Sequence, residues 1–269
     1  MPKVSSIINI SGKVDDKVHV GSKYGQLLRN APKKTNKGKA ALEQQYNRTG
    51  LLNNLAGELN RIIGNYSGKL KPPNFYQVLQ KRFRKEPLNN RFLLLKQLER
   101  LEVNPTYPLN KLGDVRVTVQ ATPKKIRVQL NALYHPSDYA GRYKTNCYTY
   151  EVSLLCWNKS TRPAIPARQF SEWIYLTDGL PEFEFQFPRP AGTVHWLVCV
   201  KQQAGVNEEP IPSFRAEGMR IMSVGSADKK EMDLLTKREE EKKARAAKDA
   251  AQKDQQPIIR VKAKTKKSL

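Results

Sequence analysis

The middle of the chain is dominated by short runs in which apolar and polar residues alternate. Val115, Val117 and Val119 alternate with polar residues, which is the period of two expected for a strand with one buried face. The same alternation recurs at residues 126–130, 148–154, 170–176 and 183–187. Turn-forming residues bound these runs and no helical period separates them. Residues 104–225 are therefore predicted to form an immunoglobulin-like antiparallel β-sandwich.

Residues 194–200 have a different pattern, because both alternating sets of side chains are apolar. Trp196 points to one side of the predicted strand, and Leu197 and Cys199 point to the other. Such a strand is expected to be covered on both faces. We therefore predict that it is central to the β domain and that Trp173 and Trp196 face the interior.

A β-hairpin and an amphipathic helix are predicted to open the chain. Residues 14–17 form the hairpin turn between short apolar-alternating runs. From residue 40 onwards apolar residues recur every three to four positions, as they do on one face of a helix. Pro72 and Pro73 are predicted to end this helix.

Two further helices are predicted before the β domain. Asn74 can cap a helix at residues 75–85, and Asn89 or Asn90 begins another, which Asn104-Pro105 is predicted to end. Their apolar faces predict packing on each other or on the sandwich. Residues 1–103 are thus predicted to be a basic hairpin-plus-helical region of an α+β protein.

Residues 226–269 are predicted to form a charged helix and a disordered basic tail. Asp228 and Glu231 have capping-box spacing at the start of this helix. The helix has almost no apolar stripe, and the tail has no means of burying itself. We expect deletion of residues 229–269 to leave the melting temperature nearly unchanged.

Positive charge is distributed unevenly along the chain. The 48 Lys and Arg residues exceed the 25 Asp and Glu residues by a formal charge of +23. Residues 1–103 carry 20 basic and 7 acidic side chains, residues 104–221 carry 14 and 10, and residues 222–269 carry 14 and 8. Because most of the excess lies outside the β domain, the charge predicts a polyanionic partner, such as nucleic acid, an acidic protein surface or anionic lipid, without choosing among them.

The candidate binding residues form three basic groups and one loop that mixes aromatic and basic residues. They are Lys33, Lys34, Lys37 and Lys39; Lys81, Arg82, Arg84 and Lys85; Tyr139, Arg142, Tyr143 and Lys144; and Lys262, Lys264, Lys266 and Lys267. Stacking rings between cations are typical of single-strand binders, but loops at the end of a sandwich equally suit protein or sugar recognition. For the second group, the sequence favours stabilisation of a helix C-terminus by its dipole, and a binding role is the alternative interpretation.

No catalytic residue, metal site or cofactor is predicted. The sequence lacks a phosphate-binding loop, a dinucleotide-binding glycine motif, a zinc-protease motif and a nucleophile elbow. His19, His135 and His195 do not have metal-ligand spacing, and His195 is interpreted as a hydrogen-bonded core residue. The sequence favours a non-enzymatic protein, and an enzyme is only a third hypothesis.

The cysteines and the absence of targeting signals predict a cytoplasmic location. Cys147, Cys156 and Cys199 lie in apolar strand runs, where they are interpreted as small buried residues; a bridge from Cys199 to one of the others is the alternative. The sequence shows no signal peptide and no run of about 20 apolar residues, so membrane insertion is not expected.

The first 60 residues or so resemble the opening of a family of uncharacterised bacterial proteins, some of them associated with phages or mobile elements. The resemblance is carried by the motif Ser11-Gly12-Lys13-Val14, the Tyr24-Gly25 pair, Arg29-x-x-Pro32, and Gln44 and Arg48 four residues apart on a helix. It implies a hairpin and a helix before a β-rich domain, with no established activity. Asp15-Asp16 departs from the glycine that is usual in the family, and no tryptophan closes the helix.

The function predicted from the sequence is that of a non-enzymatic structural or interaction protein of bacterial or phage type. Its basic regions are expected to contact an acidic partner. The alternative is a nucleic-acid-binding protein without sequence preference, for which strong salt dependence of binding is the distinguishing property.

Overall fold

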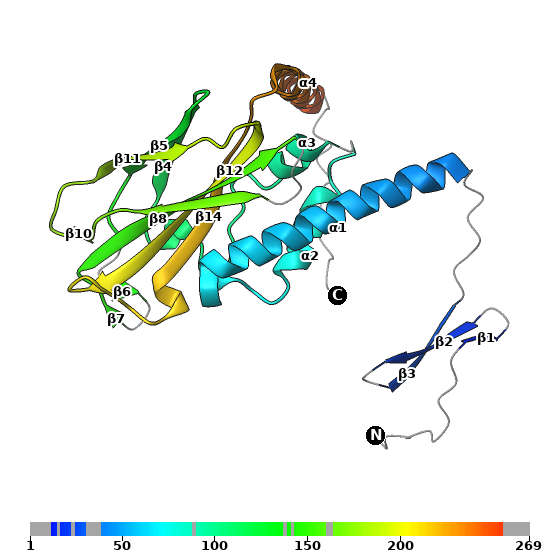
Figure 1. Cartoon of the computed structure of the whole chain (residues 1–269), viewed down its shortest axis with the longest axis horizontal. Coiled ribbons are helices and arrows are strands. Elements are labelled where there is room, and N and C mark those ends of the chain that lie inside the picture. The colour runs from blue at the N-terminus through cyan, green and yellow to red at the C-terminus, as the bar shows by residue number, and fades with distance from the viewer. Residues whose placement is uncertain are drawn as a thin grey trace, which may run out of the picture. The chain divides into compact units, whose positions relative to one another are not determined.

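The computed structural model describes residues 12–14, 17–22, 25–30, 39–87, 90–136, 139–140, 143–159 and 164–254. The chain divides into two compact units, residues 1–47 and residues 48–269 (Figure 1). Helices and antiparallel sheets are both present, so the predicted α+β class is confirmed. Within the described ranges, no helix is both long enough and apolar enough to span a membrane.

The first unit contains a three-stranded antiparallel sheet in the order β1–β2–β3. Its strands are β1 (Gly12–Val14), β2 (Lys17–Ser22) and β3 (Gly25–Asn30). Val14 pairs with Lys17, which confirms the predicted hairpin turn between them. The long helix α1 (Lys39–Ser67) begins in this unit and continues into the second.

The second unit contains two larger antiparallel sheets and a two-stranded ribbon. In the larger sheet β8 pairs with β12, β9 and β10 pair with the other side of β8, and β13 and β14 pair with the other side of β12. The smaller sheet has the order β11–β5–β4, and the ribbon consists of β6 and β7. The bounds are β4 (Val115–Ala121), β5 (Lys125–Ala132), β6 (Tyr139–Ala140), β7 (Tyr143–Lys144), β8 (Cys147–Asn158), β9 (Ile165–Phe170), β10 (Ile174–Tyr175), β11 (Glu182–Pro188), β12 (Thr193–Val206), β13 (Glu209–Pro210) and β14 (Glu217–Ser226).

The two sheets share one hydrophobic core. From the smaller sheet, β5 and β11 contribute the apolar side of their alternating residues, including Val128 and Phe185. From the larger sheet, Tyr150 on β8 and Trp196 and Val198 on β12 enter the same core. Because the side chains of a strand point alternately to its two faces, the remaining apolar residues of β8 and β12 face away from the smaller sheet.

A layer of helices covers that second face of the larger sheet (Figure 1). Trp157, Leu197 and Ile221 from the sheet share a second core with apolar residues of α1, α2 and α3. The prediction that residues 194–200 are covered on both faces is therefore confirmed. Trp196 is buried as predicted, whereas Trp173 is only partly buried.

The helices begin largely where the sequence predicts, but the predicted end of the third at Asn104-Pro105 is wrong: α3 ends at Lys96, because the chain after it hydrogen-bonds to β14. The helical elements are α1, a short 3₁₀ turn η1 (Gly68–Leu70), α2 (Phe75–Phe83), α3 (Arg91–Lys96) and α4 (Lys229–Asp254); two further 3₁₀ turns are η2 (Leu109–Lys111) and η3 (Phe214–Ala216). Asn90 caps α3 by accepting a hydrogen bond from the Leu93 N–H at 3.1 Å. The Asn74 side chain makes no such bond to α2, and the first turn is closed by backbone hydrogen bonds instead.

The helical segment and the β segment form a single packed body. Residues 48–103 contribute most of the core between helices and sheet, and residues 155–224 contribute the rest. The predicted boundary at residue 103 therefore separates two segments that pack on each other, while the boundary between the compact units lies within α1. Because these helices bury their apolar faces against the sheet, most of their stability comes from that packing.

The two outer edges of the larger sheet differ. The β14 edge is covered by the segment after α3, because the N–H groups of Arg100 and Val103 donate to the carbonyls of Ile221 and Met219 at 2.7 and 2.8 Å. No described strand pairs with the outer edge of β9. Unpaired strand edges are sites where further chains can add.

Candidate functional site

Six cations of the helical layer are exposed, and we refer to them together as the basic helical surface. They are Arg61 on α1, Lys69 on η1, and Lys81, Arg82, Arg84 and Lys85 at the end of α2. The two helices touch where Gln80 Nε2 donates to Asn53 Oδ1 at 2.7 Å. No ion pair joins any of the six cations to a described residue.

The acidic residues of the same segment are turned inward. Residues 48–103 contain only Glu58, Glu86, Glu99 and Glu102 as acids, and none of the four is exposed. Glu58 accepts from Trp157 Nε1 at 3.1 Å and from the Ala164 N–H. Burial raises the pKa of Glu58, against the opposing hydrogen bonds and the charges of Arg91 and Arg61.

The carboxylates of Glu86, Glu99 and Glu102 also make contacts within the protein, each with a basic side chain. Glu86, which is 3% exposed, accepts from Arg238 Nη1 at 3.0 Å. Glu99 pairs with Lys96 at 2.9 Å, and Glu102 pairs with Arg220 of β14. The carboxylates therefore serve internal contacts, and the exposed charge of this layer is positive.

The other predicted binding residues are placed as follows. Lys39 begins α1; Tyr139 pairs with Lys144 across the β6–β7 ribbon, and Tyr143 lies in β7. The Lys144 side chain is exposed. Lys33, Lys34, Lys37, Arg142, Lys262, Lys264, Lys266 and Lys267 lie outside the described residues. Of the predicted groups, only the one at the end of α2 is described as a cluster of exposed side chains.

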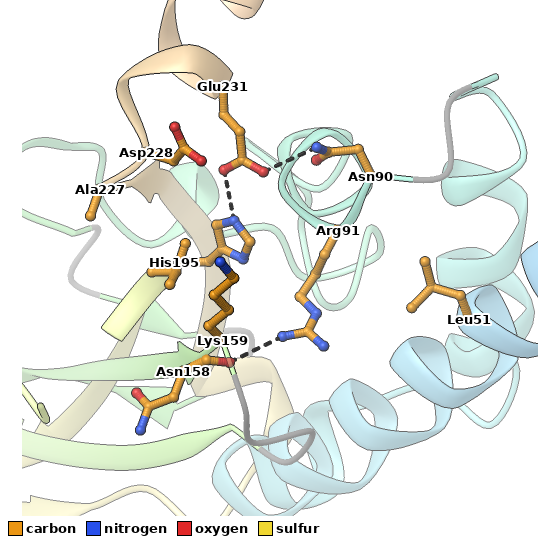
Figure 2. A pocket seen from close by; sticks show the side chains of 10 residues that line it. Leu51, Asn90, Arg91, Asn158, Lys159, His195, Ala227, Asp228 and Glu231 are labelled. Atoms are coloured by element: carbon orange, nitrogen blue, oxygen red, sulfur yellow. Dashed lines mark hydrogen bonds and ion pairs between the residues drawn. The ribbon is translucent and has the colours of Figure 1, made fainter. Parts of the chain in front are cut away.

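A pocket of about 620 Å³ lies where α3, the end of β8, the start of β12 and the start of α4 meet (Figure 2). Its polar lining includes Arg91, Asn158, His195, Asp228 and Glu231. The Arg91 guanidinium approaches the Asn158 carbonyl at 3.5 Å, which is a long contact.

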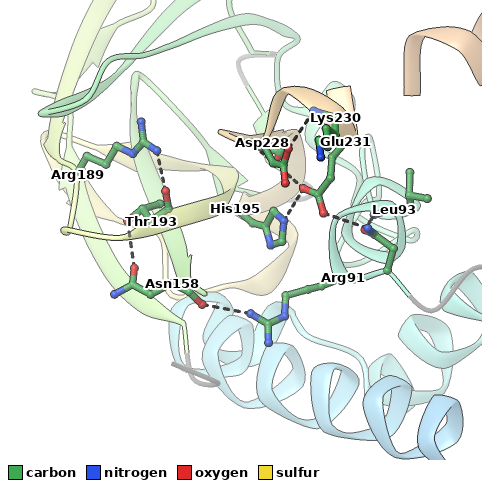
Figure 3. A network of polar contacts seen from close by, with 11 residues as sticks. Arg91, Leu93, Asn158, Arg189, Thr193, His195, Asp228, Lys230 and Glu231 are labelled. Carbon is green, nitrogen blue, oxygen red and sulfur yellow. Dashed lines mark hydrogen bonds and ion pairs between the residues drawn. The ribbon is translucent and has the colours of Figure 1, made fainter. Parts of the chain in front are cut away.

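The two carboxylates of this pocket are already engaged (Figure 3). Glu231 accepts from His195 Nε2 at 2.7 Å, from Ser226 Oγ at 2.6 Å and from Asn90 Nδ2 at 3.0 Å. Asp228 accepts from the Lys230 N–H at 2.9 Å and so caps α4. Burial disfavours ionisation of Glu231, but the three hydrogen bonds and the charge of His195 outweigh it and lower the pKa of this carboxyl.

The His195–Glu231 pair does not have the arrangement of a nucleophilic triad. A triad histidine presents its second ring nitrogen to a hydroxyl or thiol. His195 Nδ1 is buried and has no hydrogen-bond partner among the described residues, and the ring stacks on Phe92 at 5.9 Å. Ser226, the nearby hydroxyl, donates to the carboxylate instead. Among the described residues, no cluster of His, Cys, Asp and Glu could hold a metal ion.

The pair does attach α4 to the rest of the protein. Glu231 binds β12 and α3, Leu235 packs against the helical core, and Arg238 pairs with Glu86. From residue 239 to residue 247 the helix is exposed throughout. The sequence-based expectation that all of 229–269 is dispensable therefore needs correction, because the first turns of α4 bury polar and apolar groups.

Replacing Glu231 by glutamine tests this attachment. Because the pKa of Glu231 is lowered in the folded protein, its contribution to stability is present at neutral pH and is lost as the pH falls below the ordinary value of 4.5. Urea unfolding should therefore show Glu231→Gln to be less stable than the wild type at neutral pH, with the difference shrinking in acid. Asp233→Asn, on an exposed residue of the same helix, is the matched control and should change little. A pH-independent difference would contradict the ionic attachment.

His135 and the three cysteines make contacts within the fold. His135 Nδ1 lies 2.9 Å from the Tyr148 hydroxyl, and burial raises the pKa of Tyr148 to about 12. Cys147, Cys156 and Cys199 are buried and free, so the alternative of a bridge is not realised. Burial raises the pKa of Cys156 to about 11, which keeps its thiol protonated at neutral pH.

Comparison of the chain with protein-family models, with curated proteins and with solved structures found no match. The site is therefore defined by its own geometry. Two of its features could not be predicted from the spacing of residues in the sequence. They are the inward orientation of the four carboxylates and the His195–Glu231 pair, whose residues lie 36 positions apart.

Proposed function

We propose that the protein is a non-enzymatic interaction protein that binds a polyanionic partner through its basic helical surface. The observation that carries this proposal is the separation of charge in the helical layer. Its carboxylates make hydrogen bonds and ion pairs within the protein. Six of its cations, by contrast, are exposed and have no ion pair to a described residue. Unneutralised cations on a rigid face attract polyanions and steer their approach.

Helix stabilisation accounts for only part of this surface. Cations at the end of α2 do suit the negative end of its dipole. Arg61, by contrast, lies well inside α1, and Lys69 follows α1 in η1. Lys69 therefore also suits the negative end of a helix dipole, whereas the exposure of Arg61, whose charge lowers the pKa of the half-buried Glu58, favours a binding role.

The β part fits an immunoglobulin-like scaffold for such a surface. We infer this from strand order: β4–β5–β11 corresponds to strands A, B and E, and β8–β12–β14 to strands C, F and G. Strand β9 takes the place of strand D in the sequence, but it pairs with β8 of the larger sheet and not with the smaller sheet. In this proposal the helices occupy the outer face of the C–F–G sheet. Three free buried cysteines also suit a cytoplasmic protein, and a bacterial or phage origin rests on the N-terminal resemblance.

Binding to a simple polyanion at two salt concentrations tests the proposal. Full-length protein should bind heparin, and for a nucleic acid the affinity should fall about 10³-fold or more between roughly 50 and 200 mM salt if six or more phosphates are contacted. Uncharged dextran is the control and should not bind. Absence of binding to both heparin and nucleic acid at low salt, or an affinity that does not respond to salt, would contradict the proposal.

A further inference from the structure

We propose that Phe170 and Arg168, at the outer edge of β9, form a base-stacking site, and that the polyanion is single-stranded nucleic acid. This inference rests on the proposed function, because it names the class of polyanion that the basic helical surface binds. It adds a second kind of contact, made by an aromatic ring instead of a charge.

Arg168 is held between two rings. Its guanidinium carbon lies 4.8 Å from the centre of the Tyr66 ring and 5.7 Å from that of Phe170. Glu151 fixes the same guanidinium through an ion pair at 3.3 Å. Because three neighbours hold Arg168, the Phe170 ring beside it is supported on one side by a rigid, planar cation.

The Phe170 ring is displayed to solvent. It is 61% exposed, the highest value for any phenylalanine among the exposed large apolar residues of the described part. Arg168 and Phe170 are two residues apart on one strand, so their side chains share a face of the sheet. Arg168 reaches Tyr66 of α1, which identifies this face as the one covered by the helices.

The backbone N–H groups of Phe170 and Arg168 point toward the outer edge of β9. The Ser171 N–H bonds to the Tyr150 carbonyl at 2.8 Å, which makes 150 and 171 a hydrogen-bonded pair. In an antiparallel ladder the N–H groups alternate in direction. Those of Phe170 and Arg168 therefore point away from β8, toward the edge with which no described strand pairs.

The stacking site lies at the same end of α1 as Lys69, one of the cations of the basic helical surface. Tyr66 belongs to the same helix as Arg61, and Lys69 follows it by three residues in η1. A strand that crosses this region meets cations for its phosphates and one free ring for a base. That combination is characteristic of proteins that bind single strands without sequence preference.

Two features separate this ligand from other polyanions. A duplex keeps its bases stacked inside, so it cannot place one on Phe170 without unpairing. An acidic polypeptide or heparin offers charge but no base to stack. The aromatic contact should therefore matter for single strands alone.

The experiment measures binding of fluorescent oligothymidylate, of a duplex of equal length and of heparin to the full-length protein and its variants. Phe170→Ala and Phe170→Leu should each weaken oligothymidylate binding by roughly 5- to 150-fold, the loss that corresponds to one unstacked base. Duplex and heparin binding should stay unchanged, and Phe170→Trp should retain oligothymidylate binding. Phe214→Ala removes another exposed ring, 42% exposed on η3, and should have no effect. Circular dichroism establishes that each variant is folded.

The outcomes distinguish the two proposals. If heparin binds but Phe170→Ala and Phe170→Leu leave oligothymidylate binding unchanged, the stacking site is overturned and the polyanion-binding surface stands. Equal weakening of heparin binding would also overturn it, since the ring would then act through charge or fold. If neither heparin nor any oligonucleotide binds at low salt, the proposed function itself fails.

Discussion

Replacing Trp157 by alanine should lower the free energy of unfolding by about 3–5 kcal/mol, the usual cost of emptying a large core site. Trp157 is fully buried between the larger sheet and the helices. Its Nε1 also donates to Glu58, so the substitution removes a hydrogen bond to a half-buried carboxyl as well as a packed ring. Urea denaturation followed by circular dichroism measures the loss.

A second variant of Trp157 separates the contribution of its hydrogen bond from that of its packed ring, and a variant of Trp173 serves as the control. Trp157→Phe keeps an aromatic ring but no donor, and should cost about 1–3 kcal/mol, the penalty for a buried polar group that loses its partner. Trp173→Ala is the matched control, since Trp173 is only partly buried, and should cost about 1 kcal/mol. A loss below about 1 kcal/mol for Trp157→Ala would show that the helices and the sheet do not share a core.

Neutralising the end of α2 should have the largest effect on binding. In the variant Lys81→Gln, Arg82→Gln, Arg84→Gln and Lys85→Gln, four exposed cations of the basic helical surface are lost together. For a single strand each phosphate contact contributes about 0.7 to the slope of log affinity against log salt. Four contacts should therefore reduce the slope by about 3 and the affinity at roughly 0.1 M salt by two to three orders of magnitude.

The control variant removes the same charge elsewhere. Lys111→Gln, Arg116→Gln, Lys124→Gln and Arg215→Gln change four exposed cations outside the helical layer. They should weaken binding far less, because only the general field of the protein changes. Equal loss in both variants would mean that net charge, and not the helical surface, governs binding. Melting temperatures of both variants separate a binding defect from loss of the helix-dipole contribution.

The parts of the fold with local patterns could be predicted from the sequence. Alternation placed β4, β5 and β11, and the doubly apolar run at 194–200 identified the central strand β12. β14 was not singled out, because Gly218 and Gly225 interrupt its pattern. Gly225 is required there, because a side chain at this position would collide with the Trp196 ring. That requirement comes from a neighbouring strand and is invisible in a local window.

The candidate site was predicted only in part for the same reason. The cluster at the end of α2 follows from four basic residues within five positions, whose exposure depends on the helix face alone. The stacking of Arg168 between Tyr66 and Phe170 joins a helix to an edge strand, and no sequence period connects them. The acids look like ordinary surface residues in the sequence, since their partners Trp157, Arg220 and Arg238 come from distant segments.

The helices are made long before the strands they cover. Glu58 meets Trp157 99 residues later, Glu102 meets Arg220 118 residues later, and Glu86 meets Arg238 152 residues later. While the ribosome is still synthesising the β segment, the apolar sides of α1, α2 and α3 have no sheet to pack on. Contacts of such long range form slowly and leave apolar surface exposed in the meantime. The nascent chain should therefore remain sensitive to proteases, and a client for chaperones, until β14 and the start of α4 have emerged from the exit tunnel.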